Sequence, residues 1–198
     1  KNGATRKSLM INLGGGMVTD LGGFAASTFK RGMEYVNVPT TLLGAVDAAV
    51  GGKTGINFGG LKNEIGVINS SKSVVINADF FRTLDAENLR SGYAEMIKHG
   101  LISNTEIWKH ILSFDLDNVD YNRLSELLLE SISVKEKVVE IDPTEKGLRK
   151  VLNFGHTVGH AFESYAMEIG KPVLHGYAVA WGMISELYLS YKLLGFPK

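Results

Sequence analysis

Histidine recurs in three short segments of this chain, one of which also holds glutamate and lysine, in patterns that suit a metal ion held beside an anionic ligand. The segments are AEMIKHG at 94–100, LNFGHTVGH at 152–160 and LHGYAVAWGM at 174–183. At about 100° per residue, four polar side chains of a helix predicted over 148–168 fall on one narrow stripe. These are Arg149, Asn153, His156 and His160. A merely solvated helix face would normally consist of Lys and Glu, so this stripe indicates a functional face.

The metal ligands must come from His, Glu and Asp, because the chain has no cysteine. A catalytic zinc site usually takes three protein ligands and leaves one position open. His156 and His160 have the i, i+4 spacing that can bind one ion, but no HExxH glutamate accompanies them. His175 begins the next predicted helix. Taken alone, Glu95 and Lys98 are better interpreted as an exposed i, i+3 ion pair.

Two glycines, Gly155 and Gly159, interrupt the helix predicted over 148–168. Each costs about 1 kcal/mol relative to alanine in a helix interior. Their presence suggests that another group approaches the backbone closely.

Two glycine-rich turns could hold phosphate groups. Gly14-Gly15-Gly16 lies between a predicted strand and a predicted helix, where backbone N–H groups can meet a pyrophosphate. A simple tight turn explains these glycines equally well, and Asp20 could either stabilise the helix N-terminus or face a cofactor. In the loop 46–66, Lys53, Lys62 and Asn63 follow glycine pairs, and Asp47 stands in an apolar run. We favour a phosphate site there over a flexible surface loop.

Composition limits the partners and the compartment. The 198 residues include 21 Lys and Arg and 21 Asp and Glu, a net charge of zero. Nucleic acid and acidic membranes, which bind through bulk charge, are therefore not expected partners. The lack of cysteine, of a signal peptide and of a membrane-length apolar run fits a cytoplasmic protein. The chain begins at Lys1 rather than Met, and we expect it to be a piece of a longer protein.

The elements that position these residues change character near residue 85. Strands are predicted over 8–13, 34–39 and 72–80, with helices over 17–29 and 40–50, a pattern typical of a parallel α/β layer. The remainder is predicted to be helical over 86–102, 104–114, 121–140, 148–168 and 175–194. The fold class is therefore α/β followed by an all-α part, with boundaries at 1–85 and 86–198.

The chain resembles the 3-dehydroquinate synthase family over nearly its whole length. The matching motifs are GGGMVTDLGGFAASTFKRG, VPTTLLGAVDAAVGGKTGIN, LKNEIG, AEMIKHGLI, LNFGHTVGHA and HGYAVAWGM. The resemblance implies that 1–85 is part of a Rossmann-like NAD-binding domain and 86–198 a truncated helical domain that binds metal and substrate. It further implies conversion of 3-deoxy-D-arabino-heptulosonate 7-phosphate, a phosphorylated sugar acid, to 3-dehydroquinate and phosphate. The steps are NAD-dependent oxidation, phosphate elimination, reduction and intramolecular aldol closure.

The same resemblance assigns residues to roles. Zn²⁺, with Co²⁺ as an alternative, would be held by Glu95, His156 and His175. Catalytic roles fall to Asp47, Lys98 and His160. Substrate-binding roles fall to Arg31, Lys53, Lys62, Asn63, Lys135, Glu145, Arg149 and Asn153. NAD would be bound by Gly14, Gly15, Gly16 and Asp20. Arg31 is expected to act in the partner subunit of a homodimer.

Three alternatives remain at this point. 2-Deoxy-scyllo-inosose synthase and related cyclases share the metal triad, but they lack the GGKTGIN run and differ at Asn153. Glycerol-dehydrogenase-like enzymes share the architecture but not the phosphate-binding residues. The third is a fragment that binds zinc or phosphate without turnover. Because part of the dinucleotide site would be missing, we expect the chain alone to be inactive and to bind zinc far better than NAD.

Overall fold

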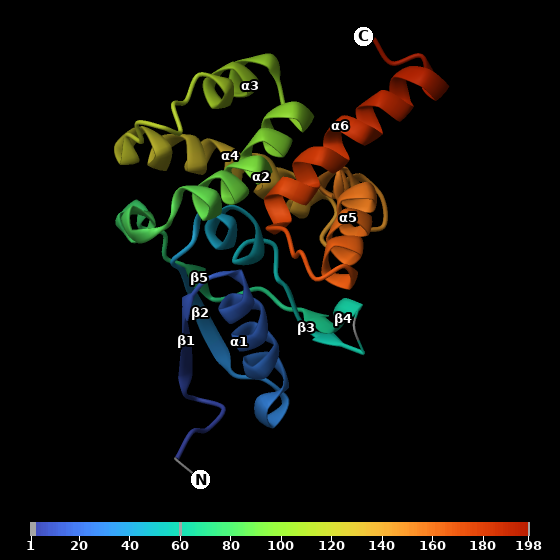
Figure 1. The fold of residues 1–198 in the computed structure, drawn as a ribbon. Helices are drawn as coiled ribbons and strands as arrows, with labels where there is room; N and C mark the ends of the chain where they lie inside the picture. Colours follow the sequence, from blue (N-terminus) through green and yellow to red (C-terminus); the bar gives the residue numbers. More distant parts are fainter. Residues whose placement is uncertain (1–2, 60, 198) are drawn as a thin grey trace.

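The strands and the longer helices occupy different parts of the molecule. The computed structural model describes residues 3–59 and 61–197, and at positions 61 and 62 the description is confined to the backbone. Figure 1 shows a small sheet with one helix in its lower part and a group of helices above it. The change of character predicted near residue 85 coincides with the start of α2 (Ala86–Ile102).

A three-stranded parallel sheet carries the glycine turn. Its strands are β1 (Leu9–Gly14), β2 (Glu34–Pro39) and β5 (Ser73–Val74), in the order β1-β2-β5. Helix α1 (Gly16–Thr28) covers one face and ends in the short η1 (Phe29–Arg31). On the covered face, buried Asn12 donates a 2.9 Å hydrogen bond to Asn37, which in turn donates to the Ala49 carbonyl. These bonds satisfy buried amides and tie the sheet to the segment that carries Asp47.

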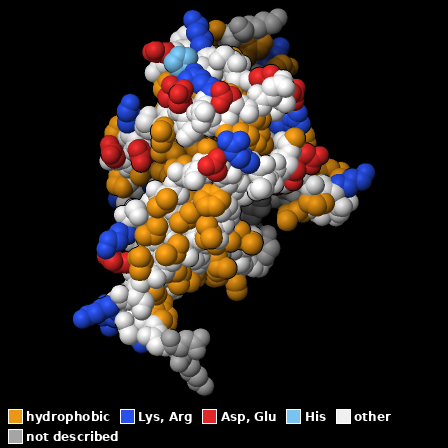
Figure 2. Space-filling view, turned by 90° about the vertical axis from the view of Figure 1, so that its left-hand side faces the viewer, with side chains coloured by type: hydrophobic (Ala, Val, Ile, Leu, Met, Phe, Trp, Pro, Cys, Tyr) orange, Lys and Arg blue, Asp and Glu red, His pale blue; other side chains and the backbone are white. Residues whose placement is uncertain are grey.

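The other face of this sheet is apolar and exposed. Leu9, Ile11 and Leu13 alternate along β1 and are each at least half exposed. Figure 2 turns this side toward the viewer and shows hydrophobic side chains gathered over the lower part of the molecule. Parallel sheets are normally covered on both faces, so this surface differs from that of a typical isolated domain.

The glycine-rich loop predicted over 46–66 is largely an antiparallel hairpin. It is formed by β3 (Lys53–Phe58) and β4 (Leu61–Ile68). Gly55 and Gly66 face each other in the register, and a Cβ at position 66 would lie 2.2 Å from the Thr54 carbonyl oxygen. Close approach of the two backbones therefore requires glycine inside the strands. These glycines hid the alternating pattern that normally predicts a strand.

Two further expectations need correction near this hairpin. The strand predicted over 72–80 is confined to β5, because a 3-10 helix, η3 (Ala78–Thr83), begins where Asn77 caps the N–H of Asp79. The helix predicted over 40–50 is a short helical segment ending in a π-helical turn, η2 (Gly44–Ala48).

The helices of the upper part begin at clear capping residues. Asp85, Asn104 and Asp120 accept backbone N–H hydrogen bonds at the starts of α2, α3 (Thr105–Leu112) and α4 (Tyr121–Ile141). The core joins both parts of the chain and includes Leu42, Val46, Phe81, Tyr93, Met96, Leu124 and Leu128. In the part of the chain that the structure describes, no helix is long and apolar enough to cross a membrane.

The single helix predicted over 148–168 is two helices. A 3-10 helix, η4 (Leu148–Asn153), ends before Gly155, whose φ of 79° lies in the left-handed region, and α5 (His156–Glu168) starts after it. The expectation that the four polar residues share one face of a single helix is therefore wrong, because the four residues belong to two helices. The predicted close approach at the glycines is confirmed: α6 (His175–Leu194) packs against Gly155 and Gly159. A Cβ at position 159 would lie 3.0 Å from the Ala178 carbonyl oxygen.

Gly182 on α6 is the tightest point of this helix pair, and we expect Gly182→Ala to destabilise the protein. An added Cβ would lie 1.9 Å from the Gly155 carbonyl oxygen, so the helices must separate. Urea denaturation should show a free energy of unfolding lower by at least roughly 1–3 kcal/mol. The control is Ile184→Ala on the exposed side of the same helix, expected within about 0.5 kcal/mol of the parent. Equal denaturation midpoints for the two variants would contradict the packing.

Candidate metal centre and adjoining cleft

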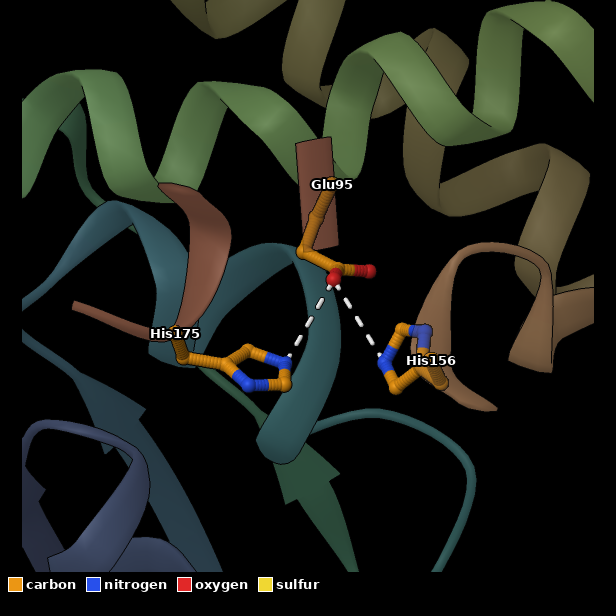
Figure 3. Close-up of side chains that lie close together, drawn as sticks. All are labelled: Glu95, His156 and His175. Carbon is orange, nitrogen blue, oxygen red and sulfur yellow. Dashed lines mark ion pairs between the residues drawn. The ribbon is translucent and has the colours of Figure 1, made fainter. Parts of the chain in front are cut away.

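Three helices bring one carboxylate and two imidazoles together. Figure 3 shows the Glu95 carboxylate, from α2, pointing between the rings of His156 and His175. Glu95 Oε1 lies 3.7 Å from His156 Nε2 and 3.6 Å from His175 Nε2. The two rings are 5.2 Å apart between centroids. His156 and His175 are the first residues of α5 and α6, so the N-termini of both helices face Glu95.

This arrangement fits a metal ion. The three ligand atoms lie within 4.8 Å of one another. Ligand atoms about 2.1 Å from a tetrahedral zinc lie roughly 3.4 Å apart, close to the two observed separations. Glu95 Oε1 is buried and has no hydrogen-bond partner among the described residues. A buried carboxylate oxygen without a donor is costly, and a cation at this point would satisfy it.

Glu95 is charged although its side chain is fully buried. Burial alone would raise its pKa, but the Lys98 ammonium and His175 outweigh burial and lower the pKa to about 2. Lys98 forms an ion pair with Glu95 Oε2, and its side chain is only 1% exposed. The i, i+3 ion pair expected from the sequence is therefore confirmed, whereas its expected exposure is wrong.

A further carboxylate, Glu163 of α5, contacts the opposite side of His175. Glu163 is buried, and its Oε2 lies 3.1 Å from His175 Nδ1. Burial would lower the His175 pKa, but the nearby carboxylates of Glu163 and Glu95 outweigh burial and raise the pKa to about 9. This raised pKa favours a protonated His175 in the absence of metal, and a metal ion that bound through His175 would displace that proton.

His160 lies beside the same cluster but is more exposed. Its ring centroid is 5.3 Å from that of His156, and its Nε2 is 3.9 Å from Glu163 Oε2. With Glu163 and His175 it forms a second group whose ligand atoms also lie within 4.8 Å of one another. Glu95 does not belong to that group, so the geometry separates His160 from the Glu95 centre.

A cleft of about 380 Å³ adjoins the metal centre. Its lining includes Asp20, Asp47, Lys53, Asn63, Lys135 and Arg149. The charge of Asp47 acts on both Glu95 and His156, which places this part of the cleft near two of the three ligands. Lys53, Lys135 and Arg149, to which the resemblance assigns substrate-binding roles, thus line one cleft. His160, to which it assigns a catalytic role, is not among the lining residues.

Two cations in the lining of this cleft, Lys135 and Arg149, are held in place by hydrogen bonds. Buried Lys135 donates a 2.6 Å hydrogen bond to the Asp47 carbonyl and forms an ion pair with its carboxylate. Burial would raise the pKa of Asp47, but Lys135 and Lys98 hold it well below its usual range. Arg149 donates to the Pro143 carbonyl at 2.7 Å and to the Gly51 carbonyl at 2.8 Å. Gly51 has a φ of 102°, which explains the glycine at this contact.

Glu145 holds two other predicted substrate residues. It forms an ion pair with Lys53 and accepts a 2.6 Å hydrogen bond from Asn153. Burial opposes the shift, but the hydrogen bonds from Lys53 and Asn153 hold the pKa of Glu145 below its usual range. An acidic side chain thus occupies Lys53 and Asn153, two residues to which the resemblance assigns phosphate binding.

Several predicted residues lie elsewhere. Gly14, Gly15 and Gly16 form the turn from β1 into α1, where a Cβ on Gly15 would lie 3.1 Å from Thr41. Close packing against Thr41, in the segment before η2, therefore explains the glycine at position 15 without a bound ligand. Arg31 is exposed at the opposite end of α1, and it is not among the residues that line the cleft. The side chain of Lys62 lies outside the described part of the chain.

Asp20 lies beyond the first turn of α1, so it does not stabilise the helix N-terminus as one reading of the sequence proposed. It lines the cleft instead, where burial and the Asp47 charge raise its pKa to about 7. An acid whose pKa is raised from 3.8 loses folding stability as pH rises between about 4 and 7.

We therefore expect Asp20→Asn to stabilise the protein most at pH 8 and clearly less at pH 5, which lies near the lower end of that window. The expected gain is roughly 1–2 kcal/mol, after allowing for solvent screening of a half-buried group. Urea denaturation of both proteins at the two pH values measures it. A gain of the same size at pH 5 would show that Asp20 acts through packing rather than through its charge.

Two carboxylates of the site were absent from the sequence-based assignment. Glu163 follows His160 by three residues, a spacing that could have predicted a shared helix face. Glu186 of α6 accepts hydrogen bonds from the N-terminus of α5, a contact between helices that no local spacing predicts.

Solved structures with this architecture define the class of fold. A 2-deoxy-scyllo-inosose synthase complexed with carbaglucose-6-phosphate, NAD⁺ and Co²⁺ has a TM-score of 0.88 and 27% identity, covering 96% of this chain and 53% of that one. The 2-epi-5-epi-valiolone synthase of Streptomyces hygroscopicus subsp. jinggangensis 5008, with NAD⁺ and Zn²⁺ bound, has a TM-score of 0.79 and 29% identity, covering 96% and 57%. The fold is that of the sugar phosphate cyclases.

The sequence narrows the class to one family. Residues 1–91 match the 3-dehydroquinate synthase N-terminal family, and residues 92–198 match the 3-dehydroquinate synthase C-terminal family. A curated 3-dehydroquinate synthase from Parabacteroides distasonis is 60% identical over 195 residues, which are 98% of this chain and 55% of that protein. The chain belongs to the 3-dehydroquinate synthase family, and it spans about half the length of the curated relatives it matches.

Proposed function

We propose that the full-length protein carrying this chain is a 3-dehydroquinate synthase of the shikimate pathway. It converts 3-deoxy-D-arabino-heptulosonate 7-phosphate to 3-dehydroquinate and phosphate. The observation that carries the proposal is the meeting of Glu95, His156 and His175 beside a cleft lined by Lys53, Lys135 and Arg149. The proposal includes NAD, Zn²⁺ or Co²⁺, a homodimer to which Arg31 contributes, and a cytoplasmic location.

The bound cofactors supply what side chains cannot. When bound, zinc supplies a Lewis acid that polarises carbon–oxygen bonds, and NAD supplies a hydride acceptor and donor. Glu95, His156 and His175 would hold the metal, while the glycine turn at 14–16 and Asp20 would hold NAD. The solved cyclases with bound NAD⁺ and Co²⁺ or Zn²⁺ support this assignment.

The residues of the cleft would bind and orient the two anionic ends of the substrate. We assign Lys135 and Arg149 to the carboxylate and Lys53 and Asn63 to the phosphate, where cations stabilise the charge of the leaving group. Asn153, which does not line the cleft but is linked to Lys53 through Glu145, is assigned to the phosphate as well. Glu145 would be displaced from Lys53 by the substrate phosphate. Asp47, held ionised beside Lys135, would accept a hydrogen bond from a substrate hydroxyl.

The deciding experiment measures product formation by the full-length protein. The protein, loaded with Zn²⁺ and NAD, is incubated with the heptulosonate phosphate, and phosphate release and dehydroquinate are followed together. A hexose 6-phosphate, which lacks the carboxylate, is the comparison substrate. Turnover of the hexose phosphate alone would instead favour a cyclase of the 2-deoxy-scyllo-inosose type. Zinc binding without turnover of either substrate would favour a binding protein.

A further inference from the structure

Helices α5 and α6 run antiparallel, and each begins with one of the two histidines of the metal centre. Gly155, at the start of α5, packs against Val179 and Met183 in the first half of α6. Further along α5, Glu163 reaches His175 at the start of α6. Helix α5 therefore meets α6 between His175 and Glu186, with each N-terminus facing a later turn of the other.

Glu186 of α6 provides the acceptor that the N-terminus of α5 lacks. The residue before α5 is Gly155, which has no side chain to cap the helix. Glu186 Oε2 accepts a 2.8 Å hydrogen bond from the Gly155 N–H, and Oε1 accepts a 3.2 Å hydrogen bond from the Val158 N–H. A carboxylate at a helix N-terminus also gains from the helix dipole. Because His156 lies between these two donors, Glu186 fixes the turn that carries it.

Glu163 of α5 acts on the ring of the other histidine. Its Oε2 contacts His175 Nδ1, while His175 Nε2 faces Glu95 Oε1. A histidine that ligates a metal through one nitrogen usually donates its other N–H to a carboxylate or carbonyl, which fixes the ring and its tautomer. Glu163 is placed to accept that hydrogen bond, on the side of the ring away from Glu95.

The spacing along both helices makes these contacts reciprocal. Glu163 follows His156 by seven residues, and Glu186 follows His175 by eleven. At about 100° per residue, both pairs lie within roughly 20° of one line along their helix. Each helix thus begins with a histidine and carries a carboxylate further along the same face. The carboxylate of each helix contacts the end of the other helix at which the histidine lies.

We propose that Glu163 and Glu186 are positioning residues that hold the two metal-binding histidines in place, each acting on the opposite helix. Glu186 sets the position of His156 through the N-terminus of α5, and Glu163 sets the ring of His175. The inference rests on the proposed metal centre and deepens it. It predicts that metal affinity depends on two carboxylates that do not themselves bind the metal.

Co²⁺ titration of the metal-free protein tests the positioning role of Glu163 and Glu186. Glu186→Ala and Glu163→Ala should each weaken Co²⁺ binding by roughly 10- to 100-fold. Glu163→Gln keeps the single acceptor oxygen that His175 needs, so it should recover most of the affinity. Glu186→Gln keeps one of two acceptor oxygens, so it should recover part of it. At saturating Co²⁺, the visible absorption bands of Glu163→Ala should be shifted, because the His175 ring is no longer held.

The control is Glu168→Ala, an exposed carboxylate on α5, which should bind Co²⁺ as the parent does. Circular dichroism and thermal unfolding of each metal-free variant separate loss of fold from loss of affinity. Unchanged Co²⁺ affinity in both alanine variants would overturn the proposal. So would glutamine variants as weak as the alanine variants, because the carboxylates would then act as ligands or through their charge. Failure of the parent to bind Co²⁺ would instead refute the proposed metal centre.

Discussion

Glu95→Ala should both destabilise the protein and abolish metal binding. Lys98 is as deeply buried as Glu95, and the two form an ion pair. Truncating one partner leaves a buried charge unpaired, which should lower the free energy of unfolding by about 3–5 kcal/mol. The metal centre loses its only oxygen ligand among the three predicted. Losing a Lewis acid worth several kcal/mol should reduce turnover roughly a thousandfold or more.

The double variant Glu95→Ala, Lys98→Met separates the two effects. It removes both buried charges and replaces lysine with an apolar side chain of similar length. Chemical denaturation of the metal-free proteins should show most of the stability restored, whereas calorimetry with Zn²⁺ should show no recovery of binding. If the single variant binds Zn²⁺ like the parent, Glu95 is not a ligand. If the double variant is no more stable than the single, the ion pair does not account for the loss.

Lys135→Ala should impair the use of carboxylate-bearing substrates most. The ammonium is buried at the cleft, bonded to the carbonyl and carboxylate of Asp47. If Lys135 also pairs with the substrate carboxylate, removing one member of that hydrogen-bonded charge pair costs about 2–5 kcal/mol of binding free energy. In the full-length protein, kcat/KM for the heptulosonate phosphate should therefore fall roughly 30- to 5,000-fold. Steady-state kinetics measured as phosphate release gives this ratio directly.

An analogue of the substrate without its carboxylate provides the internal comparison. If Lys135 binds the carboxylate, its removal should change kcat/KM for the analogue much less. Lys137→Ala, two residues along α4 at an exposed position, is the matched control and should leave both substrates unaffected. An equal loss with both substrates would show that Lys135 acts by holding Asp47 rather than by binding the carboxylate.

Local sequence patterns determined most of the elements of this protein. The periodicity of apolar residues and the caps Asp85, Asn104 and Asp120 fixed α2, α3 and α4. Alternation and β-branched residues fixed β1 and β2. These signals work because they report interactions between residues close in the chain. Motif resemblance then predicted the grouping of Glu95, His156 and His175, which lie in three separate segments.

Contacts between segments far apart in the chain determined those features of the structure that local sequence patterns did not predict. Gly55 and Gly66 lie inside strands, although glycine usually indicates a loop. Glycine is needed at these positions because the two backbones approach too closely for a Cβ. The helix predicted over 148–168 breaks at Gly155, where α6 crosses and Glu186 supplies the acceptors for a new N-terminus. The depth at which Glu95 and Lys98 are buried likewise depends on the helices around α2. Each of these features is set by groups far away in the sequence, so no local pattern could predict them.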